Sequence, residues 1–446
     1  MTTSNERAAP GHLQPAMTLF DVVALGLSAA IGVSIFSVVA PSTAVAGPAV
    51  LLTLLVAMVP MAVFVVIYAF MGSAVPRSGS SYAWPAQFVH PYLGFIVSWL
   101  RILGNAGALS LMATVFVGYL SQLVDVPRLP TMFALLLAFY LVNVFGVGLV
   151  GRAARWLVAA KLIVLAAFIF FGLPKIESMH FDPFLPHGVV GALAALPLLV
   201  GLYSGIESAA EAGEEIRNSK GTMGKGLTLS TVIAVVVYLG VTVVTIGVLG
   251  ATAAGASKAP LADAGNAFFG GWMGPALMFT ALVSIAAAIN TLTLITGRFL
   301  FAMGRDQVLP ASLGAIHPKW GTPHVAITVV FVCAVACLML PDSLVFLFLA
   351  SNIPTVFKYG SNCLAAIGLV DKHPDIHAQA AFRLHRRTVR LWGWIGVVCA
   401  LGILIVGINA DWRSYVLLLG WAVLGTVYWW LHGRHRSLAM HERTGE

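Results

Sequence analysis

Ionisable side chains are rare in the apolar stretches of this sequence, and those that occur there are the first candidates for chemistry. Arg101, Lys161 and Glu207 each lie inside a long hydrophobic run, and Arg101 shares a helix face with Asn105 at a spacing of i and i+4. An ionisable group in such a run is costly unless it is paired, hydrated or neutralised, so it marks a binding or proton site by default. The sequence contains neither a clustered nucleophile and base nor a metal-ligand motif, so we predict no enzyme activity and no metal.

Each of these residues also has a purely structural interpretation. Arg101 either receives a substrate carboxylate or forms an ion pair, with Glu207 or another acid, that fixes helix packing. Lys161 either binds and releases a proton within the membrane or extends its four-carbon stem to the cytoplasmic headgroups. We expect the second behaviour of Lys358, and Glu207 could likewise be a structural carboxylate.

The elements that position these residues are membrane-spanning helices. Of the 446 residues, 59% are hydrophobic and 9% are charged, whereas about 25% are charged in an average soluble domain. The apolar residues form runs of about 20 or more, long enough to cross a hydrocarbon core of about 30 Å. We therefore predict an all-α membrane protein with twelve transmembrane helices. The predicted spans are residues 19–41, 48–71, 91–123, 131–150, 154–173, 189–210, 227–250, 271–303, 323–341, 343–369, 391–409 and 414–432.

The loop charges predict how these spans are oriented. Most loop Lys and Arg residues fall on one predicted face, and the other face holds Arg128, Lys175, Lys258 and Arg413. Because basic residues are retained on the cytoplasmic side, we expect the richer face and both termini to be cytoplasmic, in the cell inner membrane. This asymmetry also explains the net charge of +8, so no nucleic-acid partner is predicted. Residues 1–16 are polar and no cleavage motif follows, so no signal peptide is predicted.

Two spans are interrupted near their middle. Residues 30–35 bring glycine and polar atoms into span 1, and residues 203–207 do the same in span 6, five spans later. Corresponding broken helices in two halves indicate a transporter site, because unwound backbone at membrane depth must line a cavity or be buried in protein. A break frees amide groups for an anion and carbonyl groups for a cation. A zwitterionic amino acid needs both.

Four stretches together resemble the amino acid-polyamine-organocation (APC) permeases over nearly the whole chain. They are residues 31–36 in span 1, 76–82 after span 2, 205–216 at span 6, and 304–323 after span 8. The resemblance implies a leucine-transporter-like fold, in which two inverted five-helix repeats are followed by two extra helices and spans 1 and 6 are unwound at mid-membrane.

The resemblance also implies where a substrate binds. In relatives, amides of the unwound part of span 1 hold the substrate carboxylate, and carbonyls of spans 1 and 6 hold its ammonium group. By position, the residues implied for the carboxylate are Val33, Ser34 and Ile35, and those implied for the ammonium group are Ala30, Gly201, Leu202 and Ser204.

Two pocket positions depart from the family pattern. Gly201 stands where many relatives have an aromatic gate residue, so either it leaves volume for a larger substrate side chain or Tyr203 or another aromatic residue supplies the gate. Asn105 belongs to a Gly-Asn pair that resembles the pocket of arginine/agmatine antiporters, but Arg101 does not match them. The fixed charge of Arg101 argues against a cationic substrate side chain beside it.

Lys161 resembles the span 5 lysine of proton-coupled permeases, where an ammonium group takes the place of a sodium ion. The resemblance favours amino acid symport with protons by alternating access, with Lys161 as the titrating group and Glu207 as the second candidate for proton coupling. The alternatives are an amino acid exchanger with a structural Lys161, or transport of a related amine or carboxylate solute. The sequence has no Gly-rich phosphate loop, so no ATP and no cofactor other than the proton is predicted.

The predicted organisation is therefore one transport core with short additions. It comprises a cytoplasmic tail at 1–16, a ten-helix core at 17–370 with repeats at about 17–175 and 188–370, a basic cytoplasmic loop at 371–390, helices 11 and 12 at 391–432, and a tail at 433–446. The predicted partners are a small-molecule substrate and the lipid bilayer. The identity of the amino acid and the oligomeric state stay open.

Overall fold

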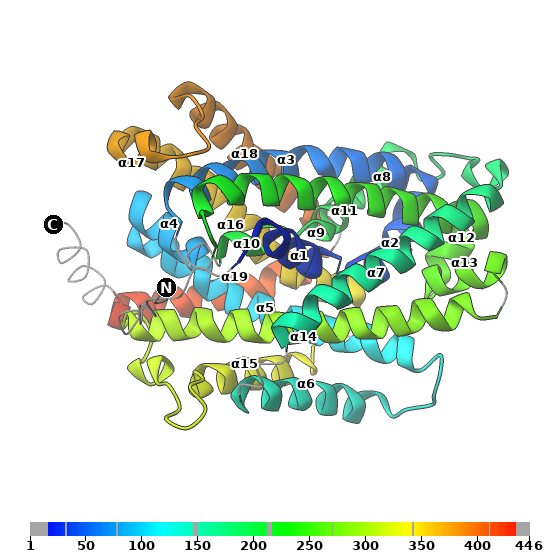
Figure 1. Ribbon diagram of the computed structural model, residues 1–446, viewed down its shortest axis with the longest axis horizontal. Helices are drawn as coiled ribbons and strands as arrows, with labels where there is room; N and C mark the ends of the chain where they lie inside the picture. The colour runs from blue at the N-terminus through cyan, green and yellow to red at the C-terminus, as the bar shows by residue number, and fades with distance from the viewer. Residues whose placement is uncertain are drawn as a thin grey trace, which may run out of the picture.

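The protein is a bundle of α-helices (Figure 1). The computed structural model describes residues 17–31, 34–76, 79–145, 150–211, 216–269, 271–340, 343–409 and 411–433. Within these ranges nearly every residue is helical, and no strand is formed apart from an isolated bridge between Met17 and Ile216. Eight helical segments there are long and apolar enough to cross a membrane. These findings confirm the helical membrane-protein class, and the number of twelve crossings stays a prediction.

In the described first half of the chain, α3, α5, α6 and α7 are long helices of 18 to 30 residues, whereas α1, α2 and α4 are shorter. Its elements are α1 (Leu19–Ala30), α2 (Ser34–Ala46), η1 (Gly47–Ala49), α3 (Val50–Ala74), α4 (Ser80–Phe88), α5 (Pro91–Leu120), α6 (Arg128–Phe145), α7 (Val150–Gly172), η2 (Leu173–Lys175) and η3 (Ser178–Phe181).

The second half begins with three short helices. Its elements are α8 (Gly188–Ala194), α9 (Leu196–Leu202), α10 (Ser208–Glu211), α11 (Ser219–Leu249), α12 (Ala251–Ala256), α13 (Pro260–Phe269), α14 (Met273–Arg305), η5 (Ala311–Gly314), α15 (His324–Cys337), α16 (Leu344–Lys372), α17 (Pro374–Gln379), α18 (Arg386–Ile408), α19 (Trp412–Tyr428) and η6 (Trp429–Gly433).

The short helices lie in the middle of the bundle. Figure 1 shows α1, α9 and α10 between long helices, with α3 and α11 on one side and α5 and α14 on the other. Helix α1 packs against α11, α7 and α10, and α9 packs against α3 and α16. The backbone at the ends of these short helices is thus enclosed by protein, where a helix end must find polar partners.

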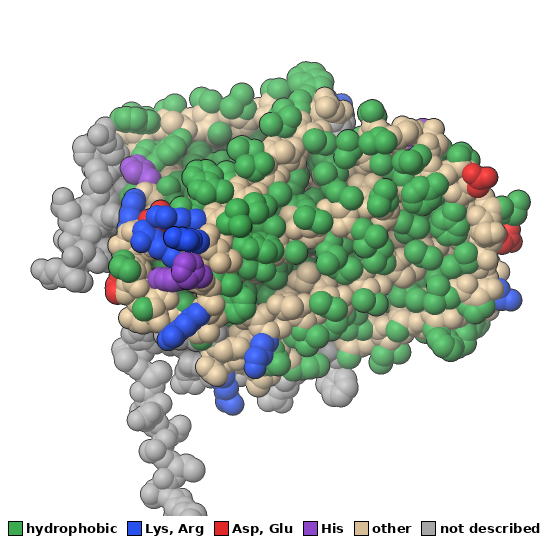
Figure 2. All heavy atoms as spheres, turned by 90° about the horizontal axis from the view of Figure 1, so that it is seen from above, with side chains coloured by type: hydrophobic (Ala, Val, Ile, Leu, Met, Phe, Trp, Pro, Cys, Tyr) green, Lys and Arg blue, Asp and Glu red, His purple; other side chains and the backbone are tan. Residues whose placement is uncertain are grey.

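The outer surface is apolar along its length. On α18, the exposed side chains Leu391, Trp394, Val398, Leu401 and Ile405 recur every three or four residues and are each 54–66% exposed. An exposed apolar stripe of this kind suits contact with lipid. Figure 2 shows hydrophobic side chains over this face of the molecule, whereas Lys and Arg side chains gather at one end.

Candidate functional site

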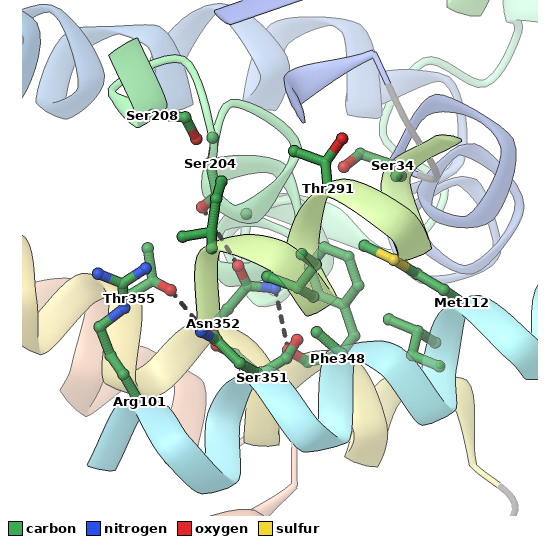
Figure 3. A pocket seen from close by; sticks show the side chains of 18 of the residues that line it. Ser34, Arg101, Met112, Ser204, Ser208, Thr291, Phe348, Ser351, Asn352 and Thr355 are labelled. Atoms are coloured by element: carbon green, nitrogen blue, oxygen red, sulfur yellow. Dashed lines mark hydrogen bonds between the residues drawn. The ribbon is translucent and has the colours of Figure 1, made fainter. Parts of the chain in front are cut away.

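A cavity of about 130 Å³ lies where the broken helices meet α5, α14 and α16. Because one buried water needs about 10–15 Å³ by this kind of measure, the cavity has room for a solute on the order of ten waters in size. Both broken segments reach it, and the polar side chains of three long helices complete its wall (Figure 3). A small polar molecule in the cavity would therefore contact both broken segments and three long helices.

The first broken segment contributes the start of α2. Helix α1 ends at Ala30, helix α2 begins at Ser34, and Ser34 lines the cavity. The start of α2 directs backbone N–H groups and the positive end of a helix dipole toward this region, which suits a carboxylate. Val33 lies outside the described residues.

The second broken segment contributes a turn between α9 and α10. Helix α9 ends at Leu202, and Gly205 adopts φ +107°, a backbone conformation that favours glycine over residues with a side chain. The turn brings Ser204, Gly205, Glu207 and Ser208 to the cavity wall. A glycine at position 205 is therefore what lets the chain turn here and present polar groups.

Half of the predicted site residues line the cavity. They are Ser34, Arg101, Asn105, Gly201, Ser204 and Glu207. Figure 3 shows Arg101 extending from α5 toward Thr355 of α16. The guanidinium carbon of Arg101 also lies 5.7 Å from the centre of the Phe299 ring.

The other described candidates are packed behind the wall. Ala30, Ile35, Leu202 and Tyr203 have at most 1% of their surface exposed and do not line the cavity. The Tyr203 hydroxyl donates to the Leu54 carbonyl at 3.3 Å, so this ring is not placed to gate the cavity. The Leu202 carbonyl, implied for the ammonium group, already accepts a hydrogen bond of 3.0 Å from a tyrosine of α11.

Lys161 is buried against the end of α1. Its side chain is 5% exposed, and Nζ donates to the carbonyl oxygens of Leu27 at 3.4 Å and Ile31 at 3.2 Å. These are among the last carbonyls of α1, which lack partners within their own helix. The negative end of the helix dipole stabilises an ammonium group there. The charge on Lys161 is thus linked directly to the first break.

Lys358 was expected to extend to the headgroups, and that expectation was wrong. Its side chain is 1% exposed, and Nζ lies 2.5 Å from Oε1 of Glu207. The second carboxylate oxygen of Glu207 accepts the backbone N–H of Gly205 at 3.0 Å. The pair therefore joins the turn after α9 to α16, and both of its members line the cavity.

Further polar wall residues come from α16. Figure 3 shows Ser351, Asn352 and Thr355 at the wall, and Asn352 accepts a hydrogen bond from the Ser204 hydroxyl at 3.2 Å. These residues are not among those predicted from the sequence. A signal was present, because Phe348, Ser351, Thr355 and Lys358 recur at helical spacing and so share one face.

Helices α5 and α14 are joined at the cavity wall by a hydrogen bond. Asn105 donates to the Thr296 hydroxyl at 2.9 Å, and Thr291 lines the wall. On the same helix, the side-chain oxygen of Asn290 accepts a hydrogen bond of 2.9 Å from Asn143 of α6. The wall of the cavity thus presents both donors and acceptors, as a zwitterion requires.

Residues 17–427 match the family described as amino acid permease. The chain belongs to this family. The match spans the broken helices and every long helix around the cavity, so the cavity described above lies within the permease unit. The protein is thus a membrane transporter rather than an enzyme.

Similar proteins are found along nearly the full length. A branched-chain amino acid permease of Bacillus subtilis (strain 168) is 26% identical, with 98% of this chain and 96% of the relative covered. A methylthioribose transporter of the same organism is 25% identical over 98% of this chain and 97% of the relative. An aspartate-proton symporter, also from that organism, is 22% identical over 73% of this chain and 67% of the relative.

Proposed function

We propose that this protein is a secondary active transporter that carries an amino acid together with a proton by alternating access. The observation that carries the proposal is the position of Lys161, whose ammonium group lies among the last carbonyls of α1, directly before the first break. A titratable group in contact with the binding segment can couple protonation to substrate binding. Two of the similar proteins, whose names describe an amino acid permease and an amino acid-proton symporter, support the same conclusion.

The coupling would act through the end of α1. When Lys161 is protonated, its N–H groups satisfy two carbonyls there and the charge favours the helix C-terminus. Loss of the proton removes the positive charge and one N–H donor of Lys161, so the interaction of Lys161 with the end of α1 becomes weaker. In the described part of the chain Lys161 forms no ion pair, so no fixed carboxylate offsets this change. Protonation would thus favour one arrangement of the first break over the other.

The substrate would lie across the cavity between the two breaks. Its carboxylate would be held by amides at the start of α2, where Ser34 lines the cavity, and its ammonium group by carbonyls of Gly201 and the turn that follows. Asn105 and Arg101 of α5 would contact the remainder of the molecule. We propose that Glu207 contributes to coupling through its pair with Lys358, because a change in either charge would release the turn after α9 from α16.

We propose a membrane topology with twelve crossings and two inverted repeats. The protein would lie in the cell inner membrane, with both termini in the cytoplasm. The support is the positive-inside bias. On α18 the basic residues stand at the first turns, where Arg386 and Arg390 pair with Asp371 at 3.3 and 2.6 Å. This end of the bundle would be cytoplasmic.

The test is uptake by proteoliposomes under an imposed pH gradient. A panel of radiolabelled amino acids should include branched-chain residues and aspartate, with the native protein compared with Lys161→Ala. Lys175→Ala is the matched control, because Lys175 is an exposed lysine shortly after the same helix. We expect uptake that follows the proton gradient in the native protein and the control, without sodium, and uptake that ignores the gradient in Lys161→Ala.

Other outcomes would overturn parts of the proposal. Uptake that requires an internal amino acid and ignores the pH gradient in the native protein would make it an exchanger, with Lys161 structural. Uptake of methylthioribose or another solute, with no amino acid transported, would leave the transporter class intact but refute the substrate.

A further inference from the structure

The cavity has a small apolar neighbour toward the beginning of α16. This second cavity, of about 10 Å³, is lined by residues of α2, α5, α9 and the first turn of α16. Phe348 and Leu111 line both cavities. Because both residues belong to the lining of each cavity, they form the partition between the two cavities.

Phe348 stands against Gly201. A Cβ atom at position 201 would lie 2.5 Å from Cε1 of Phe348 and 2.6 Å from Nδ2 of Asn352. Any side chain on α9 at this position would therefore collide with α16. The glycine does not leave empty volume for a larger substrate, since the Phe348 ring occupies the space beside it.

We propose that Phe348 of α16 is the aromatic gate of the substrate cavity and that Gly201 is required so that this ring can close. The ring lies between the substrate cavity and the small apolar cavity toward the beginning of α16, and thus between the site and that end of the helix. The side to which it opens rests on the topology proposed above, in which α16 begins at the extracytoplasmic face. Phe348 would then close the cavity to the outside.

The gate is connected to the substrate site by Asn352. Its Nδ2 donates to the Phe348 carbonyl at 2.9 Å, and its Oδ1 accepts from the Ser204 hydroxyl at 3.2 Å. Ser204 belongs to the turn that would bind the ammonium group. A substrate that displaces the Ser204 hydroxyl would remove the hydrogen-bond donor of Asn352. Asn352 lies one helical turn after Phe348. Occupancy of the site and closure of the ring are thereby linked.

The accessibility of a cysteine in the cavity tests the gate directly. Ala108 lines the cavity and is small, so Ala108→Cys serves as the reporter in a chain without its native cysteines. The native cysteines to be replaced are Cys333, Cys337, Cys363 and Cys399. Labelling by a membrane-impermeant methanethiosulfonate reagent is followed from the extracytoplasmic side of oriented vesicles, with and without Phe348→Ala.

Phe346→Ala is the matched control. Phe346 is a phenylalanine on the same helix, is 3% exposed, and lines neither cavity. We expect Phe348→Ala to accelerate labelling of the reporter several-fold and Phe346→Ala to leave the rate unchanged. If Phe348→Ala does not fold, Phe348→Leu removes the ring while retaining an apolar side chain, and it should accelerate labelling as well.

Equal labelling rates with and without the Phe348 ring would refute the gate, as would equal acceleration by the Phe346 control. The result is independent of the transport assay. If labelling accelerates although no amino acid is carried, the gate stands and the proposed substrate fails. If an amino acid is carried and labelling is unchanged, the gate alone fails.

Discussion

Removal of one member of the Glu207–Lys358 pair should destabilise the protein strongly, whereas removal of both should not. The two side chains are 8% and 1% exposed, and their charged atoms lie 2.5 Å apart. Breaking a buried pair leaves an uncompensated charge in a low dielectric and costs about 3–5 kcal/mol, whereas replacing both partners by neutral groups is often close to neutral. We therefore expect Glu207→Gln and Lys358→Met each to lower the free energy of unfolding by about 3–5 kcal/mol, and the double variant to lower it by much less.

The choice of glutamine isolates the ion pair. A glutamine at position 207 retains an oxygen that can accept the Gly205 N–H, whereas the ion pair and the hydrogen bond with Lys358 are lost. Denaturant unfolding of the four proteins in detergent, followed by tryptophan fluorescence, gives the coupling energy of the cycle. The exposed Asp371–Arg390 pair is the control, since such pairs contribute about 0–1 kcal/mol. Additive losses in the Glu207–Lys358 cycle would refute the reasoning that these charges depend on each other.

Two further predictions concern Gly201 and Asp411. Gly201→Ala should reduce uptake and lower stability by about 1–3 kcal/mol, because its Cβ would meet the Phe348 ring, whereas Gly107→Ala, which meets nothing within 4 Å, should leave uptake unchanged in the same assay. Asp411 begins α19 and accepts hydrogen bonds from the backbone and side chain of Arg413, which hold the pKa of this carboxyl below its usual range. The stabilisation is therefore present above the ordinary pKa of Asp and lost as pH falls through the lowered one. Asp411→Ala should cost about 1 kcal/mol in thermal unfolding at neutral pH and less in acid, and an equal cost at both would contradict this.

The membrane class followed from the sequence, because apolar run length has direct physical meaning, whereas the unwinding of spans 1 and 6 at mid-membrane stays a prediction. The breaks at 30–35 and 203–207 both reach the cavity through Ser34 and Ser204. Substrate binding by backbone amides and carbonyls at these breaks stays a prediction, since side-chain identity carries little information about it.

The contribution of α16 to the cavity wall could not be predicted as directly from the sequence. Lys358 and Glu207 are 151 residues apart, so nothing local indicates that they pair. A lysine within an apolar run near a helix end suggests snorkelling, and only the tertiary packing turns Lys358 inward. The role proposed for Phe348 could not be predicted locally either, because it depends on a glycine without a side chain, Gly201, on α9. Lys161, which has the same type of side chain as Lys358, is also buried.

The central claim is that Lys161 couples proton movement to amino acid movement, and proton flux measures this most directly. Proteoliposomes that enclose a pH-sensitive dye are given a transported amino acid from outside, with no other gradient imposed. For the native protein we expect acidification of the lumen that depends on the amino acid, and for Lys161→Ala we expect amino acid entry without acidification. Acidification that persists in Lys161→Ala, or its absence when the native protein transports, would contradict the account.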